Sequence, residues 1–324
     1  MQPFQYVHAD TPDHAVEAAR PREARYIAGG TTLVDLMRLE VMRPTQLVDI
    51  TGLAFTAIED VGGGVRIGAL ATNTDVAYHP LVTARFPALA EALLSGASPQ
   101  LRNMATVGGN LLQRTRCPYF RDGTSACNKR VPGQGCAAVD GVTRSHAVLG
   151  TSASCIATHP SDMCVALVAL DAVVHTHGDA GDRAIPIADF HTLPGAHPEI
   201  ESALAPGELV THVEIPASPF ALRSRYTKVR DRASYAFALA SAAVALDLLG
   251  TTIRDARIAL GGVATKPWRA REAEQALIGR TTSLETFRRA AAIALQGATP
   301  HGDNAFKVEL ARRTIVRALQ RGAA

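Results

Sequence analysis

The strongest chemical signal in this 324-residue sequence is a cluster of cysteines. All five lie between Cys117 and Cys164, and the first four follow the spacing Cys117-x9-Cys127-x8-Cys136-x18-Cys155. Zinc ribbons use tight C-x2-C pairs, which are absent here. Four thiolates gathered by one loop can instead bind a [4Fe–4S] cluster, which accepts four cysteine ligands without regular spacing. The sequence therefore predicts an iron–sulfur site at these four positions.

The segment that carries these cysteines, at about 114–156, has no helical or strand periodicity and is rich in glycine and proline. A long irregular segment inside a compact domain is usually functional. Its two acidic residues, Asp122 and Asp140, are outnumbered by six basic ones: Arg114, Arg116, Arg121, Lys129, Arg130 and Arg144. This excess would offset the negative charge of a thiolate-bound cluster. Scattered free thiols or disulfides are the alternative interpretation.

The fifth cysteine and two histidines near this segment have simpler interpretations. Cys164 lies in the apolar run 163–167, which predicts a buried position in a helix. His146 and His159 flank the proposed cluster, where either could donate a hydrogen bond, although an isolated loop histidine is more often a surface or turn residue. The other histidines show no H-E-x-x-H pattern or comparable metal spacing.

Two Gly-Gly turns form a second candidate site. The segments 27–33 (I-A-G-G-T-T-L) and 106–110 (T-V-G-G-N) place paired glycines beside hydroxyl or amide side chains. Such turns let backbone N–H groups approach a phosphate, and a helix N-terminus adds partial positive charge. One Gly-Gly turn alone predicts only a tight turn, whereas two suggest opposite sides of a pyrophosphate. Neither segment is G-x-G-x-x-G or G-x-x-x-x-G-K-[ST], which disfavours Rossmann and P-loop folds.

The elements around these turns predict an α/β layout. Strands are expected at 26–28, 47–50, 65–69, 173–176 and 209–215. Helices are expected at 33–37, with Thr31 or Thr32 as the cap, at 81–94, and from Ser161-Asp162 to Leu170.

The segment Pro216–Pro219 interrupts the pattern and is the predicted boundary between two domains, 1–218 and 219–324. Beyond it, 237–249 and 253–262 read as two extended segments joined near Gly250. Three helices are expected to close the chain, at about 270–278, 284–295 and 306–319.

Composition excludes several classes of protein. Hydrophobic residues make up 47% of the chain, enough for a buried core, and the net charge of +3 is too evenly spread for a dedicated nucleic-acid binder. No apolar run approaches the roughly 20 residues that a transmembrane helix needs, so no membrane insertion is expected. The first 20 residues carry Asp10, Asp13 and Glu17 and do not resemble a signal peptide.

The A-G-G-T-T and T-V-G-G-N segments resemble those of the FAD-binding subunits of the xanthine dehydrogenase and aldehyde oxidoreductase family of molybdenum hydroxylases. The resemblance includes the tail from Tyr226 and the run I-A-L-G-G-V at 258–263, and covers nearly the whole chain. It implies a mixed α+β and α/β fold. A PCMH-type FAD-binding domain with two α/β subdomains would be followed by a CO-dehydrogenase-flavoprotein-like domain, with a three-stranded antiparallel sheet plus helices.

The resemblance also implies that both turns hold the FAD pyrophosphate, that Asp162 serves the flavin site, and that Lys228 lies near the isoalloxazine and tunes it. On local sequence alone, Asp162 is equally a helix N-cap and Lys228 a surface lysine. The cofactor-binding residues implied are Ile27, Ala28, Gly29, Gly30, Thr31, Thr32, Leu33, Thr106, Gly108, Gly109, Asn110, Ser161, Asp162, Val210 and Lys228.

The cysteine loop is absent from most flavin subunits of this family. The runs C-P-Y-F-R-D at 117–122 and C-I-A-T-H-P-S-D at 155–162 resemble the flavin/iron–sulfur subunit of bacterial periplasmic aldehyde oxidoreductases. This implies an electron-transfer subunit with FAD and a [4Fe–4S] cluster. Its partners would be a small subunit with two [2Fe–2S] clusters, a large molybdenum-cofactor subunit that oxidises the substrate, and an external acceptor such as a quinone, oxygen or NAD.

Location and function each leave an alternative open. Co-export with a signal-bearing partner would place the chain in the periplasm, and the cytoplasm is the alternative. A self-sufficient flavin oxidase of the vanillyl-alcohol type would need a substrate pocket with a base and a large cap domain. A non-catalytic iron–sulfur scaffold would have lost its flavin.

Overall fold

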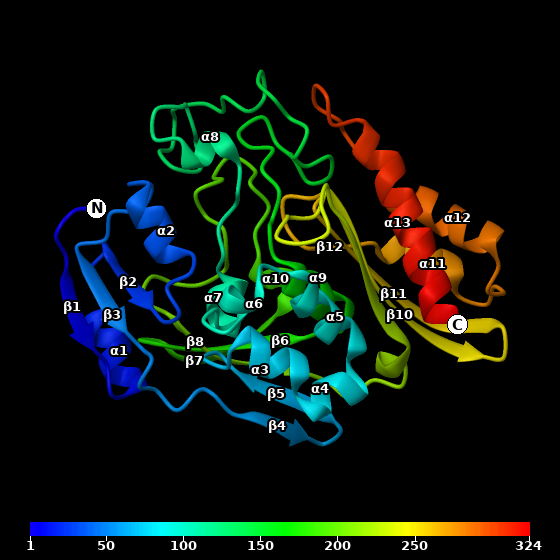
Figure 1. The fold of residues 1–324 in the computed structure, drawn as a ribbon, viewed down its shortest axis with the longest axis horizontal. Coiled ribbons are helices and arrows are strands. Elements are labelled where there is room, and N and C mark those ends of the chain that lie inside the picture. The colour runs from blue at the N-terminus through cyan, green and yellow to red at the C-terminus, as the bar shows by residue number, and fades with distance from the viewer.

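The N-terminal part of the chain begins with a small parallel sheet. A computed structural model describes all 324 residues, and its first sheet has the order β1-β3-β2. The strands are β1 (Gln5–His8), β2 (Ala24–Ile27) and β3 (Gln46–Asp49). Because parallel strands need crossover connections, α1 (Pro12–Ala18) and α2 (Leu33–Arg38) link them. This sheet lies at the left of Figure 1.

A second, antiparallel sheet of five strands follows, in the order β4-β5-β8-β6-β7. Its strands are β4 (Ile58–Val61), β5 (Gly64–Gly68), β6 (Val173–Gly178), β7 (Gly181–Pro186) and β8 (Leu209–Ile215). The helices of this part are α3 (Asn73–Tyr78), α4 (Pro80–Arg85), α5 (Pro87–Ser95), α6 (Pro99–Arg102), α7 (Val107–Leu111), α9 (Asp162–Ala169) and α10 (Ile187–Phe190). The strands expected at 173–176 and 209–215 are confirmed, whereas β1, β4 and β7 were not predicted.

The single helix predicted over 81–94 is wrong. The structure has two helices there, α4 and α5, which meet at Phe86 with φ −132° and ψ 57°. Pro87 explains the break, because proline has no N–H to donate and disfavours the helical conformation of the residue before it. Apolar spacing continues across the break because Phe86 and Leu89 both face the core.

The C-terminal part is an antiparallel sheet covered by helices. Its order is β12-β11-β10-β9, with η1 (Ala221–Arg223), β9 (Ser224–Val229), β10 (Ala240–Leu249), β11 (Thr252–Gly261) and β12 (Trp268–Arg269). The predicted extended pair, its turn at Gly250 and the three closing helices are confirmed: α11 (Arg271–Leu277), α12 (Leu284–Ala294) and α13 (Phe306–Ala323). The sheet has four strands instead of three, because β12 adds two edge residues, too few to show a strand period.

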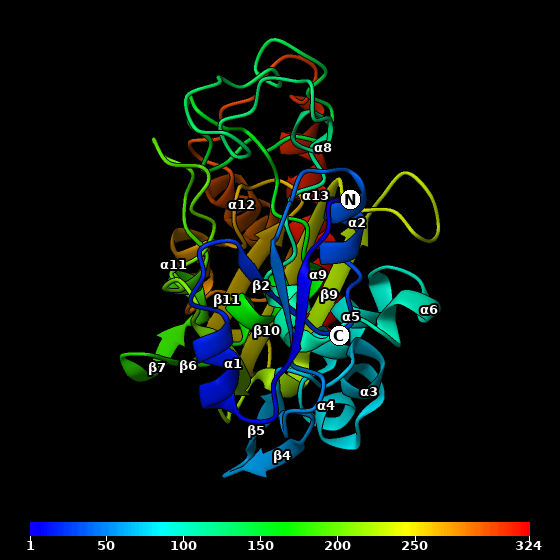
Figure 2. The ribbon, with the colours of Figure 1, turned by 90° about the vertical axis from the view of Figure 1, so that its left-hand side faces the viewer.

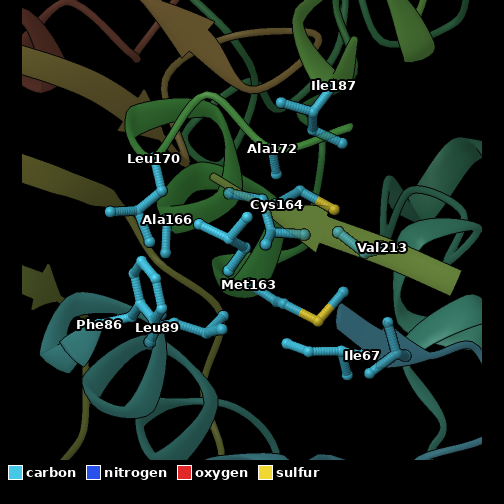
Figure 3. Packing of buried hydrophobic residues seen from close by; sticks show 14 of the residues in the cluster. Ile67, Phe86, Leu89, Met163, Cys164, Ala166, Leu170, Ala172, Ile187 and Val213 are labelled. Carbon is cyan, nitrogen blue, oxygen red and sulfur yellow. The ribbon is translucent and has the colours of Figure 1, made fainter. Parts of the chain in front are cut away.

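Helix α9 is the centre of the largest core. It packs against α5, β10 and β11, and every residue from Met163 to Ala169 is buried. Figure 3 shows Met163, Cys164 and Ala166 of this helix among side chains from neighbouring elements, including Ile67 and Val213. Cys164 is 0% exposed, as the apolar run predicted.

The cysteine segment 114–156 is irregular, as predicted, apart from the short helix α8 (Pro118–Arg121). Figures 1 and 2 both place it at the top of the molecule, above α2. None of the helices combines the length and the hydropathy needed to cross a membrane.

Candidate functional site

The first glycine turn presents free backbone donors. It follows β2, and Gly30 adopts φ +68°, the left-handed conformation that glycine tolerates best. The N–H groups of Gly29, Gly30, Thr31 and Thr32 have no hydrogen-bond partner within the chain. Thr32 occupies the N-cap position of α2, but its side chain caps nothing. The turn therefore offers a short row of donors at a helix N-terminus, where an anion would be stabilised.

The two glycine turns lie side by side. A Cβ on Gly29 would fall 1.7 Å from the carbonyl oxygen of Met104, a distance that real atoms do not adopt. Met104 lies two residues before Thr106, where the second turn begins. Only glycine at position 29 permits this backbone contact, which joins the small parallel sheet to α7.

The second turn differs from the first in its hydrogen bonds. Thr106 caps α7 by accepting a hydrogen bond from the N–H of Gly109 at 3.2 Å, and Gly108 donates to the carbonyl of Ala69 at 2.8 Å. Its backbone amides are therefore engaged, contrary to the expectation that both turns present free N–H groups. Asn110 remains as a donor, because its Oδ1 accepts from Ser161 at 2.8 Å and its amide nitrogen faces no protein acceptor.

Asp162 and Lys228 form a buried ion pair. Ser161 caps α9, and the next residue, Asp162, lies 2.7 Å from Nζ of Lys228, with the side chains 10% and 4% exposed. Lys228 also donates to the carbonyl of Ser95, and Tyr226 donates its hydroxyl proton to Asp162. Burial, together with the Asp162 carboxylate, holds the pKa of Tyr226 well above its ordinary value. Lys228 is thus not the surface lysine that local sequence suggests.

A continuous series of contacts therefore connects most of the predicted cofactor residues. Contacts run from the first turn to Met104, along the second turn to Asn110, and then through Ser161 to Asp162 and Lys228. Val210 is buried near the start of β8. The carbonyl of the next residue, Thr211, binds the N–H of Ala69 at 2.9 Å, and Ala69 in turn binds the second turn.

The four loop cysteines line one cavity. Cys117, Cys127, Cys136 and Cys155 surround a space with about 280 Å³ of empty volume, part of it open to solvent. All four are free thiols, and all but Cys136 are buried. Apolar side chains such as Phe120 supply most of the remaining wall. Burial raises the pKa of Cys117 to about 12 and also raises that of Cys155. Disulfides and scattered thiols are both absent from this arrangement.

Of the two histidines expected near the cluster, only His146 contacts one of the four loop cysteines. Its Nε2 lies 3.2 Å from Sγ of Cys117, and burial lowers its pKa. His159 instead packs edge-on against His191, with 4.4 Å between ring centroids. Its Nδ1 accepts the N–H of Ser161, so Nε2 carries the proton of the neutral ring.

Helix α2 joins the first turn to the cysteine loop. Asp35 pairs with Arg116, which precedes Cys117, at 2.9 Å and with Arg121, the last residue of α8, at 2.8 Å. The hydrogen bond from Arg121 lowers the pKa of Asp35. On the same helix, Leu36 packs in one apolar cluster with three of the four cysteines. Sequence reasoning missed both residues, although they lie directly after the predicted glycine turn.

The basic residues of the loop act mainly as anchors. Arg114 and Lys129 both pair with Glu201, at 2.6 Å and 2.8 Å, and Arg144 pairs with Asp231. Arg130 donates to backbone carbonyls within the loop. Three carboxylates from outside the loop therefore pair with five of the six basic residues that the sequence assigned to offsetting a cluster.

Comparison with known proteins agrees with this geometry. Residues 2–218 match the family model described as the FAD-binding domain in molybdopterin dehydrogenase, and residues 225–321 match the CO dehydrogenase flavoprotein C-terminal domain. The chain is 50% identical over 323 residues to the aldehyde oxidoreductase FAD-binding subunit PaoB of Escherichia coli, covering 98% of each chain.

Solved structures show the same fold. Carbon monoxide dehydrogenase from Hydrogenophaga pseudoflava aligns with a TM-score of 0.78 at 27% identity, covering 99% of this chain and 97% of that one. Quinoline 2-oxidoreductase from Pseudomonas putida aligns with a TM-score of 0.77 at 25% identity over the same shares. Fold and site together define an FAD-binding subunit of an oxidoreductase. The chain belongs to the family of FAD-binding medium subunits of the molybdenum hydroxylases.

Replacing Gly29 by alanine should weaken FAD binding. The new Cβ would collide with the Met104 carbonyl and push the two turns apart. We expect at least a tenfold loss of affinity, about 1.4 kcal/mol, measured by flavin fluorescence titration of the FAD-free chain. Gly123→Ala is the matched control, because nothing lies within 4 Å of its Cβ position. Equal FAD affinity in the two variants would contradict the proposed contact.

Replacing Lys228 by methionine should destabilise the fold strongly. The change leaves the Asp162 carboxylate buried without its cation, which typically costs about 3–5 kcal/mol. In the control, Arg144→Met, the broken pair is half-exposed, with side chains 50% and 60% exposed, and should cost less than about 1 kcal/mol. Chemical denaturation followed by circular dichroism measures both. Similar losses in the two variants would count against a buried, structural ion pair.

Acid should destabilise the protein through His191. Burial lowers its pKa to about 4 from 6.5, so the folded state binds fewer protons than the unfolded state between these pH values. The free energy of unfolding should therefore fall as pH drops through this window, by up to about 1.4 kcal/mol per pH unit for this residue. Urea unfolding at several pH values should show a shallower fall in His191→Gln. An unchanged slope would show that His191 does not contribute.

Proposed function

We propose that this chain is the FAD- and [4Fe–4S]-binding electron-transfer subunit of a heterotrimeric molybdenum hydroxylase of the aldehyde oxidoreductase type. A large partner with a molybdenum cofactor oxidises the substrate, and a small partner with two [2Fe–2S] clusters passes electrons to this chain. The convergence of four free cysteines on one cavity beside α2 carries the proposal. Family membership favours such a subunit over a self-sufficient flavin oxidase or a flavin-free scaffold.

The glycine turns fit the FAD pyrophosphate. Four unpartnered N–H groups of the first turn match the acceptor oxygens of a diphosphate, and the Asn110 amide can donate from the second turn. The close backbone contact at Gly29 leaves no room for a side chain on this side of the cradle. Asp162 and Lys228, tied to each other, then supply fixed charges near the flavin. In this role Lys228 tunes the ring without being a solvent-exposed cation.

The cysteine cavity fits an iron–sulfur cluster better than a zinc ion. One zinc ion holds four thiolates at about 2.3 Å, which brings the sulfur atoms within about 4 Å of one another. The four cysteines do not form a group whose ligand atoms all lie within 4.8 Å, although two other groups in the chain do. A cubane cluster places each thiolate on a different iron and so needs the wider spacing.

Bound flavin can accept electrons one at a time and deliver two to an acceptor such as a quinone, oxygen or NAD. This chain's own residues bind the diphosphate, fix the charges around the ring and exclude water from the Asp162–Lys228 pair. The cysteine cavity, with its apolar wall and His146 beside Cys117, would shield a cluster from solvent. A cluster held by these four cysteines would either store electrons or only brace the loop.

The substrate class and the cellular location are inferred from similarity to related proteins. The relative from Escherichia coli is an aldehyde oxidoreductase subunit, so we infer an aldehyde as the substrate class of the whole complex. The resemblance of the cysteine loop to that of bacterial periplasmic aldehyde oxidoreductases supports a periplasmic location, reached by co-export with a signal-bearing partner.

Replacing Cys127 by serine should remove the cluster and leave FAD bound. The variant loses one of four thiolates, whereas the glycine turns lie outside the cavity. Iron analysis and visible absorption of anaerobically purified protein should show iron lost and the flavin bands retained. Cys164→Ser is the control, because Cys164 lies in the α9 core away from the cavity, and should keep its iron. Wild-type protein purified anaerobically without any iron would refute the proposed cluster.

A further inference from the structure

A second group of ligand-type side chains lies on the five-stranded sheet. His175 of β6 and His212 of β8 are opposite each other in the antiparallel register. Glu214 lies two residues along β8 from His212 and therefore on the same face of the sheet. Val174 and Val213, the alternate residues, point into the core instead. The two imidazoles stack at 4.2 Å, with only 8° between their planes.

The ligand atoms of these three residues lie close to one another. One from each lies within 4.8 Å of the other two. Glu214 approaches His175 Nε2 at 3.5 Å and His212 Nε2 at 3.6 Å, but neither contact is a hydrogen bond. His175 Nε2 is moreover inaccessible to solvent and has no hydrogen-bond partner. A buried polar atom without a partner calls for an explanation, such as an ion.

Hydrogen bonding around Thr211 fixes which nitrogen of His212 is free. The Thr211 hydroxyl donates its one proton to the carbonyl of His175 at 3.2 Å. It must then accept from Nδ1–H of His212, 3.0 Å away. In the neutral ring, His212 Nε2 consequently carries a lone pair that faces the Glu214 carboxylate. Two electron-pair donors facing each other without a proton between them favour a cation between them.

We propose that His175, His212 and Glu214 bind one divalent transition-metal ion of the zinc class. Two imidazole nitrogens and one carboxylate oxygen are the donor set of open, three-ligand zinc sites, in which water fills the remaining positions. Thr211 would orient the His212 ring from outside, as second partners of metal-bound histidines commonly do. The proposal is independent of the flavin and of the cysteine cavity.

Arg66 sets the strength of this site. Its guanidinium binds Oε1 of Glu214 at 2.8 Å, which fixes the carboxylate and leaves Oε2, the oxygen 3.5 Å from His175 Nε2, for the metal. The positive charge of Arg66 also opposes a nearby cation. The side chains of all three ligands are between 24% and 29% exposed, so one edge of the site faces solvent although the His175 Nε2 atom itself is covered. These features describe an exchangeable site and not a permanently buried structural metal.

The other histidine group of similar geometry does not qualify. His159, Cys164 and His191 also place ligand atoms within 4.8 Å of one another. His159, however, uses the lone pair of Nδ1 to accept the N–H of Ser161. The remaining nitrogen then bears the proton and cannot bind a metal as a neutral ring.

Metal titration of the complete chain tests the proposal. Zn²⁺ binding to anaerobically purified protein is measured against a chromophoric chelator, and Co²⁺ serves as the spectroscopic probe. We expect one zinc equivalent in the wild type, bound at least tenfold more weakly by His212→Ala and by Glu214→Gln. His197→Ala is the matched control, because this exposed histidine also lies beside a glutamate, Glu199, at 3.1 Å, and its affinity should equal that of the wild type.

The Co²⁺ spectrum separates this site from the cysteines. Bound through nitrogen and oxygen, the Co²⁺ ion should show visible d–d bands, and these bands should diminish in both ligand variants. Any thiolate-to-Co²⁺ charge-transfer band would come from the cysteines and should be the same in the wild type and in the two variants. Circular dichroism shows whether each variant is folded. Two different ligand substitutions are used so that misfolding of one leaves the other as a test, and Glu214→Gln preserves the size of the side chain. Unchanged zinc affinity in the folded variants, or Co²⁺ bound through thiolate alone, would overturn the proposal.

Discussion

The contacts that helix α2 makes from its N-terminus to its middle tie the proposed flavin site to the cysteine loop. Its N-terminus presents the free amides of the first glycine turn, and Asp35 and Leu36 hold the loop. The two Asp35 ion pairs are partly exposed and contribute little stability, typically below about 1 kcal/mol each. Leu36 is 1% exposed, and burial of such a side chain contributes about 1.5–3 kcal/mol. Apolar packing therefore supplies most of the stability of the contact between α2 and the cysteine loop, and the ion pairs set the orientation of the loop on the helix.

Helix α9 is the second element that positions the proposed flavin site. Its buried body anchors the large core, while its N-terminus carries Ser161 against Asn110 and Asp162 against Lys228. An isolated buried carboxylate would be costly, but here it has a lysine, a tyrosine and the positive end of a helix around it. Because Lys228 belongs to β9, the Asp162–Lys228 ion pair holds the C-terminal sheet against the N-terminus of α9, next to the second glycine turn. The cysteine loop contacts α2 and leads along the chain into α9.

Local sequence signals predicted much of this structure, and long-range contacts account for the rest. Alternating and apolar runs identified most strands, Ser161 marked the start of α9, and the cysteine spacing indicated one shared site. The break at Pro87 was overlooked because apolar spacing continues through it. The engaged amides of the second turn depend on Ala69, far away in sequence. His175 and His212 meet only through the register of two strands, which no histidine spacing reveals.

Native mass spectrometry of the anaerobically purified chain tests most directly whether one polypeptide holds both groups. The account predicts a single folded species whose excess mass equals one FAD and one [4Fe–4S] cluster, with any exchangeable zinc removed beforehand by a chelator. A species with FAD alone, or with FAD and a chelator-resistant zinc ion in place of the cluster, would contradict it.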